Sequence, residues 1–307
     1  MELWLYGMIV NMRVSFSIPL KPRSGKHKFA MLLAKEMKRQ GIKVTDKKPD
    51  VNLVFLKGIR KGCKNIFRLD GVWMNTRMNL NKNKNLRKTM KSCDGVVYQN
   101  EFCRKAGEEF LGRFKSYAVI LNGSKMPAVE PFKHDRPYLL SFARWRPHKR
   151  LKATTEGFLE SGLQSKYDLL VLGKDPDYII DHAAVKYLGF QSKDLWSIIL
   201  GSKFVVHLAY IDWCPNSVVE SLIAGKNVLH SSTGGTKDVV RGNGIALTDK
   251  PWDFKPIDLY SPPSLDMTEL SQSYNDMLNL SSPECEYLSI ERTAKKYIKY
   301  CRKVLNE

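Results

Sequence analysis

The feature that most constrains this fold is a regular alternation of short apolar runs with amphipathic segments. One such segment places apolar side chains on one face at helical spacing and ends at Gly41: Phe29, Leu32, Leu33 and Met37. Short β-rich or apolar runs surround it, at 13–20, 42–45, 50–56, 65–69, 95–98 and 117–121. Short strands separated by helices are typical of a parallel sheet covered by helices. The first part of the chain therefore predicts an α/β domain.

The same alternation starts again beyond a proline-containing stretch. Residues 125–137 hold three prolines and no hydrophobic period, which is typical of a linker. Strands are then predicted at 138–142, 168–172, 185–188, 204–208 and 227–230. A chain of 307 residues is long enough for two domains. We therefore expect two Rossmann-like domains facing a cleft, at 1–130 and 131–285, and a C-terminal helix at 286–307 that packs back on the first domain.

Basic residues outnumber acidic ones by a wide margin. The chain has 50 lysines and arginines against 31 aspartates and glutamates, a formal charge of +19. This excess favours an anionic partner such as a nucleotide, an anionic membrane surface or a nucleic acid. A lysine-rich surface without a specific partner explains the excess equally well, and the Lys- and Asn-heavy run at 79–91 fits that interpretation.

The cysteines and the start of the chain indicate a reduced, cytoplasm-like compartment. The six cysteines show no CxxC spacing and no nearby histidine cluster, so a zinc site is not expected. Residues 1–10 are apolar but too short for a membrane span, and they lack the basic region of a secretory signal. We interpret them as an extra edge strand or an arm. The expected location is the cytoplasm, that of a host if the protein is viral, with peripheral attachment to a membrane as an option.

The stretch 211–225 combines the end of a strand, an acidic loop and the start of a helix. A run at 204–208 that is typical of a buried strand precedes it, and Asp212 and Glu220 lie eight positions apart within it. In an open α/β sheet, a strand end followed by a helix N-terminus is a usual place for a phosphorylated ligand. The sequence therefore predicts a ligand site here.

Two residues of the first domain are weaker candidates. Asp70 follows a predicted strand, where polar residues often line a site, although a turn or a helix cap explains it as well. Ser24-Gly25-Lys26 is not a P-loop, because Leu20 and His27 stand where that motif needs Gly and Ser or Thr. We expect Asp70 to line a site and Gly25 to lie in a loop facing the ligand cleft, with a plain βα turn as the alternative for Gly25.

Five short motifs occur in one order along the chain. They are Val119-Ile120-Leu121-Asn122-Gly123, the loop 141–151, Leu188-Gly189-Phe190, Asp212 to Glu220, and Ala224-Gly225 with Gly234-Gly235. In that order they resemble the V-I-P-N-G-V, GRL-x-P-x-K-G-L, F-L-G-x-V, E-x7-E and ACG…GG-x-x-E elements of family 4 retaining glycosyltransferases, which have the GT-B architecture. The matches cover the second domain well and the first loosely. The segment 68–112 resembles viral and phage relatives more than common bacterial ones.

The resemblance implies that the second domain binds a nucleotide diphosphate sugar. Arg144 and Lys149 fall on the Arg and Lys of the loop motif and would clamp the diphosphate, one as a planar donor fork and the other as a point charge. Glu220 would accept the ribose hydroxyls, and Asp212 would hold the sugar. Preorganised positive groups beside a developing anion are usually the largest catalytic contribution. Neither a metal nor a cofactor is expected, because the central proline of Asp175-Pro176-Asp177 argues against a metal-binding DxD motif.

Further contacts are expected, with Gly25 on the donor side and Asp70 on the acceptor side. The amides of Asn216, Ser217 and Val218 are predicted to point free N–H groups at the diphosphate from the helix start, and Phe190 lies in a matching motif. The chain departs from the family pattern at two places, because Asp212 replaces the first Glu and Trp213-Cys214 replaces Gly-Phe. The identity of the sugar is therefore not carried over from the family.

The expected function is that of a nucleotide-sugar-dependent retaining hexosyl- or pentosyltransferase. Its acceptor would be a glycan, a lipid or a protein-linked sugar. A phage or viral DNA-modifying glycosyltransferase acting on a hydroxylated base is one alternative. An inactive nucleotide-sugar-binding module, suggested by Asp212, is the second. The expected partners are a nucleotide sugar and, from the charge, an anionic acceptor such as a membrane surface or DNA.

Overall fold

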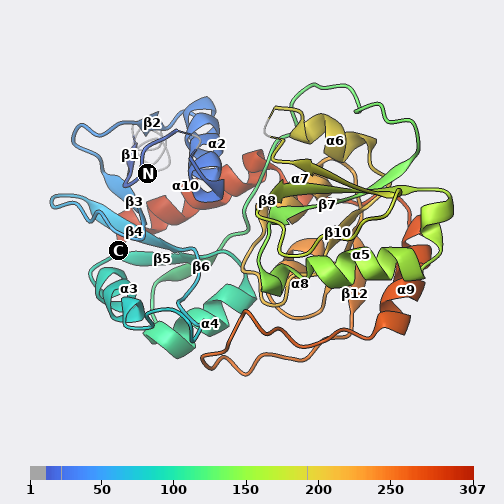
Figure 1. Ribbon diagram of the computed structural model, residues 1–307. Helices are drawn as coiled ribbons and strands as arrows, with labels where there is room; N and C mark the ends of the chain where they lie inside the picture. Colours follow the sequence, from blue (N-terminus) through green and yellow to red (C-terminus); the bar gives the residue numbers. More distant parts are fainter. Residues whose placement is uncertain (1–11, 22, 192) are drawn as a thin grey trace. The chain divides into compact units, whose positions relative to one another are not determined.

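The computed structural model describes residues 12–21, 23–191 and 193–307 and divides the chain into two compact units (Figure 1). The first unit contains the residues up to 74 together with 78–124 and 287–307. The second unit contains 75–77 and 125–286. The predicted edge strand or arm at 1–10 lies outside the described residues.

The first unit is built on a six-stranded parallel sheet. Its strand order, β2-β1-β3-β4-β5-β6, is that of a flavodoxin-like sheet, in which the connections change direction between β1 and β3. All five residues of β3 are buried, as expected for a central strand covered on both faces. The strands are β1 (Arg13–Phe16), β2 (Lys43–Val44), β3 (Val51–Phe55), β4 (Lys64–Leu69), β5 (Gly95–Tyr98) and β6 (Tyr117–Val119).

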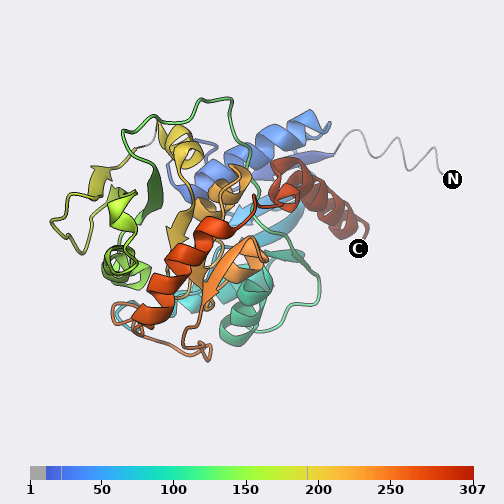
Figure 2. The ribbon, with the colours of Figure 1, turned by 90° about the vertical axis from the view of Figure 1, so that its right-hand side faces the viewer.

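Helices cover both faces of this sheet. The apolar residues of α2 (Gly25–Arg39) and α10 (Ile290–Asn306) pack in one core with β1 and β3. On the opposite face, α4 (Glu101–Leu111) approaches Leu69 and Tyr98 so closely that Gly107 has no room for a side chain, and α3 (Lys82–Lys91) packs beside α4 (Figures 1 and 2).

The C-terminal helix belongs to the first unit, as predicted. The Tyr297 ring of α10 lies 6.1 Å from the Phe29 ring of α2. The Tyr300 hydroxyl accepts a hydrogen bond from the Val96 amide at 3.1 Å and donates one to the Ser116 carbonyl at 2.8 Å, which ties α10 to the ends of β5 and β6. Within the described ranges, no helix has both the length and the apolar character needed to cross a membrane.

The second unit contains another six-stranded parallel sheet, in the order β12-β11-β10-β7-β8-β9. This is the strand order of a Rossmann fold, and its direction changes between β7 and β10. The strands are β7 (Tyr138–Arg144), β8 (Asp168–Lys174), β9 (Val185–Gly189), β10 (Val205–His207), β11 (Val228–Ser231) and β12 (Gly244–Leu247). Two parallel sheets with interleaved helices thus confirm the predicted α/β class.

Helices again lie on both faces. The Tyr274 hydroxyl of α9 donates to the Thr154 carbonyl of α5 at 2.7 Å, so these two helices pack together over the core that β7, β8 and β10 share. The helices are α5 (Leu151–Glu160), α6 (Leu195–Gly201), α7 (Asn216–Ile223), α8 (Thr236–Val240) and α9 (Met267–Asp276). Short 3-10 turns lie at Pro147–Lys149, Leu163–Ser165, Met277–Asn279 and Glu286–Leu288.

The predicted pattern was incomplete after β11. The sequence pattern predicted no strand at β12 and no helices at α8 and α9. β12 has four residues, of which only Leu247 is buried, so its hydrophobic pattern is too weak to identify. Its place in the sheet depends on pairing with β11, which sequence periodicity cannot show.

Candidate functional site

The residues predicted to hold the donor gather at the carboxyl edge of the second unit's sheet, where the strand order changes direction. Arg144 is the last residue of β7, and Lys149 ends the 3-10 turn that follows it. His207 is the last residue of β10, and Asp212 lies in the loop beyond it. Ligands of open α/β sheets bind at such a switch point, so this edge is the candidate site.

Three of these side chains form one buried charged group, the Lys149–Asp212–His207 cluster. The Lys149 ammonium lies 2.5 Å from Asp212 Oδ2, and His207 Nε2 lies 3.1 Å from the same oxygen. The side chains of Lys149 and Asp212 are 16% and 17% exposed, and that of His207 is 5% exposed. A carboxylate held this far from water needs compensating donors, and the two neighbours supply them.

The electrostatics of the cluster define its protonation state. Burial by itself raises the pKa of the Asp212 carboxyl, but the Lys149 ammonium and the hydrogen bond with His207 outweigh burial and hold that pKa well below its ordinary value. Burial lowers the pKa of His207, against the opposing effect of Asp212. At neutral pH the cluster therefore combines an ionised aspartate, a charged lysine and a neutral imidazole whose Nε2–H donates to the carboxylate.

The backbone around Asp212 is held in an unusual conformation. Ile211 has a φ of +56°, which is rare for a β-branched residue. The Gly235 N–H donates to the Asp212 carbonyl at 2.7 Å, and the Trp213 N–H donates to Asp212 Oδ1 at 2.9 Å. A side chain on Gly234 would lie only 2.8 Å from the Asp212 amide nitrogen. The Gly-Gly turn after β11 therefore supports the backbone that positions the Asp212 carboxylate.

Arg150 supports the site but was not predicted from the sequence. It stands where the loop motif has Gly, and its φ of +58° is the left-handed conformation that glycine adopts freely. Its buried guanidinium forms two hydrogen bonds with Asp249, at 2.6 and 3.0 Å, and a third with the Pro263 carbonyl at 2.8 Å. The Leu208 carbonyl, in the loop before Asp212, lies 3.3 Å from the same guanidinium. Arg150 thus joins the loop after β7 to the loop that carries Asp212, and the signal for it was an arginine at a glycine position.

His207 was also missed, although its position contained a signal. It ends a buried strand at the edge where ligands bind, and polar residues at such strand ends often line a site. Its neighbour in register on β11 is His230, which is also buried and whose Nδ1 lies 2.8 Å from the Ser231 carbonyl. Two adjacent strand ends therefore place buried imidazoles beside the site.

The start of α7 differs from the prediction in one respect. The Val218 N–H donates to the Pro215 carbonyl at 3.1 Å, so this amide is used within the first turn and is not free for a ligand. Asn216 and Ser217, the first two residues of the helix, are half-buried. Glu220 follows on the next turn and is 6% exposed, so its carboxylate is enclosed by the protein.

Arg144 and Phe190 are the exposed members of the predicted set. Arg144 makes no ion pair or hydrogen bond with its side chain among the described residues, which leaves its guanidinium available to an anion. Phe190 follows β9, is 64% exposed and lies under the Lys174 ammonium at 5.3 Å. Asp175, just after β8, has a φ of +56°. In the described ranges, no group of three acidic, histidine or cysteine side chains could hold a metal.

The two candidates of the first unit lie in different settings. Asp70 pairs with the guanidinium of Arg68, a buried residue of β4. Arg68 also donates to Asn122 Oδ1 at 2.6 Å and lies over the Phe29 ring at 4.5 Å. Asp70 therefore has a structural role as the counter-ion of a buried arginine. Gly25, the first residue of α2, is exposed.

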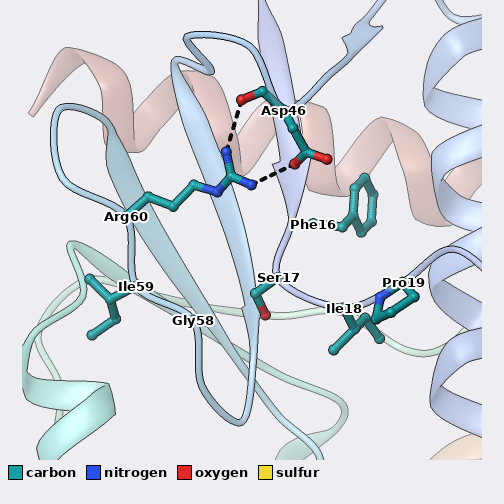
Figure 3. A pocket seen from close by; sticks show the side chains of 8 residues that line it. All are labelled: Phe16, Ser17, Ile18, Pro19, Asp46, Gly58, Ile59 and Arg60. Carbon is teal, nitrogen blue, oxygen red and sulfur yellow. Dashed lines mark hydrogen bonds and ion pairs between the residues drawn. The ribbon is translucent and has the colours of Figure 1, made fainter.

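A pocket of about 460 Å³ opens at the carboxyl ends of β1 and β3, the switch point of the first unit's sheet (Figure 3). Arg60 lies along one wall. Its guanidinium donates to the Asp46 carbonyl at 2.9 Å and to the Asp46 carboxylate at 2.7 Å. Ile59 lies on the rim and is 42% exposed. The remaining lining residues are Phe16, Ser17, Ile18, Pro19 and Gly58. The pocket thus has a mixed lining of apolar and polar residues, with one ion pair.

We expect the second unit to lose stability when the pH falls from 7 to 5. Burial lowers the pKa of His148 to about 3 and that of His230 to about 4, from an ordinary 6.5. Both rings stay neutral in the folded chain but are protonated in the unfolded chain below pH 6.5. Proton uptake by the unfolded chain therefore lowers the free energy of unfolding as the pH falls from 6.5 toward the pKa values of the folded chain. The loss is about 2 kcal/mol for each histidine at pH 5.

Urea unfolding followed by tryptophan fluorescence measures this loss, because four of the six tryptophans belong to the second unit. A variant with both His148→Gln and His230→Gln should lose much less stability between pH 7 and 5. Equal pH dependence in the variant and the parent protein would contradict the assignment.

Comparison with known proteins gives a family match for most of the second unit. Residues 124–253 match the family model described as Glycosyl transferases group 1. No curated protein matches the sequence significantly. Among solved structures, Anabaena HepE in complex with UDP and glucose gives a TM-score of 0.64 at 12% identity, over 95% of this chain and 100% of that one.

Two further structures are similar. Sucrose-phosphate synthase from Thermosynechococcus elongatus gives a TM-score of 0.65 at 10% identity, over 96% of each chain. A glycosyltransferase from Rickettsia africae gives 0.61 at 13% identity, over 97% of this chain and 99% of that one. At these identities the structures establish the fold, and the family model adds the class of domain. Residues 124–253, nearly all of them in the second unit, thus match a group 1 glycosyltransferase domain, and the whole chain has the GT-B fold of these structures.

Proposed function

We propose that this protein transfers a sugar from a nucleotide diphosphate donor to an acceptor, with retention of the anomeric configuration. The observation that carries the proposal is the Lys149–Asp212–His207 cluster at the switch point of the second unit, with exposed Arg144 at the end of the adjoining strand. The similar structures support a nucleotide sugar, since Anabaena HepE was solved with UDP-glucose. Retention is proposed from the family motifs.

The charges at the site suit a diphosphate that gains charge as its bond to the sugar breaks. Arg144 supplies a planar fork of donors without a partner among the described residues, and Lys149 supplies a point charge. In this structure the Lys149 charge faces Asp212, so we propose that Lys149 bridges the carboxylate and the diphosphate. The enclosed Glu220 binds the ribose, and Asp212, oriented by His207, binds the sugar hydroxyls.

The proposed step needs no protein nucleophile. The acceptor hydroxyl oxygen forms the new bond to the anomeric carbon on the face from which the diphosphate leaves. The bond from that carbon to the diphosphate oxygen breaks, and its electron pair stays on the diphosphate. The acceptor proton passes to the departing phosphate oxygen. Arg144 and Lys149 stabilise the charge that develops there, so the proposal assigns no metal and no cofactor.

We assign the acceptor to the first unit. Its pocket at the ends of β1 and β3 is about 460 Å³, within the usual size of a small-molecule site. The pocket offers an acceptor both the apolar side chains of Phe16, Ile18 and Ile59 and the polar contacts of the Asp46–Arg60 pair. Asp70 belongs to the same unit, where its ion pair with Arg68 orders the end of β4.

The decisive experiment incubates the full chain with a panel of nucleotide sugars and measures the nucleoside diphosphate released. Release from one donor, with a candidate acceptor raising the rate, would support the enzyme. The anomeric configuration of the product, read by NMR, tests retention, and a chelator added to the same assay should leave the rate unchanged. Binding of a donor without release under any condition would instead indicate an inactive nucleotide-sugar-binding module.

The Gly-Gly turn provides a further test of the site. Gly234→Ala should lower turnover by about 10- to 100-fold, because the new methyl group would displace the Asp212 backbone by tenths of an ångström. Gly225→Ala is the matched control, since Gly225 also has a positive φ, of +74°, but has open space for a side chain. Both variants lose stability from the strained backbone. A similar loss of turnover in both would show that strain, and not displacement of Asp212, is responsible.

A further inference from the structure

The excess positive charge of the chain lies entirely in the first unit. That unit contains 31 lysines and arginines against 11 aspartates and glutamates, a formal charge of +20. The second unit contains 19 against 20, a formal charge of −1. The unit proposed to bind the anionic donor is thus nearly neutral, so the charge of the first unit needs another explanation.

The charge is also uneven between the two helical faces of the first unit. Helices α2 and α10 together hold eleven lysines and arginines against two glutamates, and α3 and α4 hold seven against three acidic residues. One of the two glutamates on the first face, Glu36, is buried and pairs with Arg39 at 2.7 Å. The outer surface of the α2 and α10 layer is therefore almost purely cationic.

Helix α10 arranges its cations in a single stripe. Its exposed basic residues recur at helical spacing, opposite the residues buried in the core: Arg292, Lys295, Lys296, Lys299 and Lys303. Lys295 and Lys299 are four positions apart, as are Lys299 and Lys303, and like charges at this spacing destabilise an isolated helix. Within the described residues, Lys295, Lys296 and Lys299 make no ion pair. The helix thus keeps three uncompensated lysines, which suits a partner that supplies the negative charge.

The stripe continues onto α2. Gln40, just after α2, donates to the Glu291 carbonyl at the start of α10 at 3.0 Å, so the end of one helix meets the start of the other. The last two turns of α2 carry Lys35, Lys38 and Arg39, all exposed. We call the exposed cations of the two helices, from Lys35 to Arg39 and from Arg292 to Lys303, the α2–α10 basic face.

We propose that the α2–α10 basic face docks the protein on an anionic lipid bilayer. Clusters of four to eight basic residues on an amphipathic helix are typical of attraction to anionic headgroups. The apolar sides of both helices are buried in the core of the unit, so the contact is electrostatic and does not require insertion. This inference goes beyond the proposed function, because it holds for any donor sugar.

The composition of the face favours lipid over nucleic acid. Lysine predominates on it, and lysine is a flexible point charge without the fork that reads base edges. The tyrosines of α10, Tyr297 and Tyr300, are buried and cannot stack on bases. What the face offers is charge on long, mobile stems, which matches a fluid headgroup surface.

The test measures sedimentation of the full chain with vesicles. At about 0.1 M salt, the parent protein should bind vesicles that contain about 30% phosphatidylserine, should not bind pure phosphatidylcholine, and should dissociate at about 0.5 M salt. The variant Lys295→Ala with Lys299→Ala should bind about 25-fold more weakly, at roughly fivefold per lysine. Lys84→Ala with Lys88→Ala, on α3, is the matched control with the same charge change and spacing, and should weaken binding less than threefold.

Three outcomes would overturn the proposal. They are binding to neutral vesicles, equal weakening by the two double variants, and tighter binding to a DNA duplex or single strand than to vesicles with the same loss in the α10 variant. The last result would assign the face to nucleic acid. Thermal unfolding checks that the variants fold. Release of nucleoside diphosphate without vesicles is measured in parallel, so loss of docking and failure of the proposed enzyme activity are separate results.

Discussion

Replacing Lys149 with alanine is expected to lower turnover by about 100- to 1,000-fold, the usual effect of removing one preorganised group at a developing anion. The variant loses the charge that faces the diphosphate and also leaves the buried Asp212 carboxylate with only His207 as a side-chain partner. Loss of the diphosphate contact acts mainly on kcat, and misplacement of the carboxylate raises the KM for the donor. Steady-state assays at varied donor concentration separate the two effects.

Three further variants test the interpretation of this result. Lys149→Arg keeps the charge and should retain more activity than Lys149→Ala. Arg144→Ala should also reduce turnover strongly, because the guanidinium lies at the end of the neighbouring strand β7. Lys152→Ala removes an exposed cation three residues beyond Lys149 and should leave activity near that of the parent protein. If both Lys149→Ala and Arg144→Ala turned over donor normally, the phosphate clamp would be misassigned.

Arg150→Leu is expected to destabilise the second unit by about 3–5 kcal/mol, the range for removing one partner of a buried ion pair. The change leaves the Asp249 carboxylate, whose side chain is fully buried, without its bidentate partner. Urea unfolding followed by tryptophan fluorescence gives the change in the free energy of unfolding.

Further variants separate the lost ion pair from the strained backbone. Arg150→Gly relieves the backbone and loses the pair, so it should remain destabilised. Arg150→Leu combined with Asp249→Leu removes both charges and should recover part of the loss, as buried ion pairs often do when replaced by apolar residues. Arg77→Ala breaks an exposed pair with Asp258 in the same unit and should cost less than about 1 kcal/mol. Equal losses for Arg150→Gly and Arg77→Ala would rule out a structural role for the buried pair.

Local sequence patterns were sufficient to identify most elements of both sheets. β5 was predicted with its observed bounds, and β3, β4 and β7 within two residues at each end, because each is a short buried run between clear turn signals. The same reasoning failed at β12, which is mostly solvent-accessible and therefore lacks an apolar run. A strand that is buried on both faces needs a continuous run of apolar residues, which can be recognised in the sequence. A strand at the edge of a sheet does not need such a run.

The residues of the candidate site also divide into those that the sequence predicted and those that only the structure revealed. Arg144, Lys149 and Asp212 were selected from the resemblance of their motifs to a known family, whereas the 2.5 Å contact between Lys149 and Asp212 joins residues 63 positions apart. His207 was overlooked because a single histidine in an apolar run is indistinguishable from a core residue. The Val218 amide was expected to be free, but the turn at Pro215 uses it, which depends on the local backbone geometry.

The sequence by itself determined that the chain forms two helix-covered parallel sheets, and its motif resemblance indicated candidate site residues in the loops after β7 and β10. Periodicity and motif spacing are local properties, and both follow from which side chains each segment must bury or present. Only the tertiary structure decided that β7 and β10 are neighbours, that Asp212 is a partner of Lys149 and His207, and that Arg150 contacts both Asp249 and the Leu208 carbonyl of the loop after β10. These facts depend on pairing between segments far apart in the chain, and pairing is set by the packing of the whole unit.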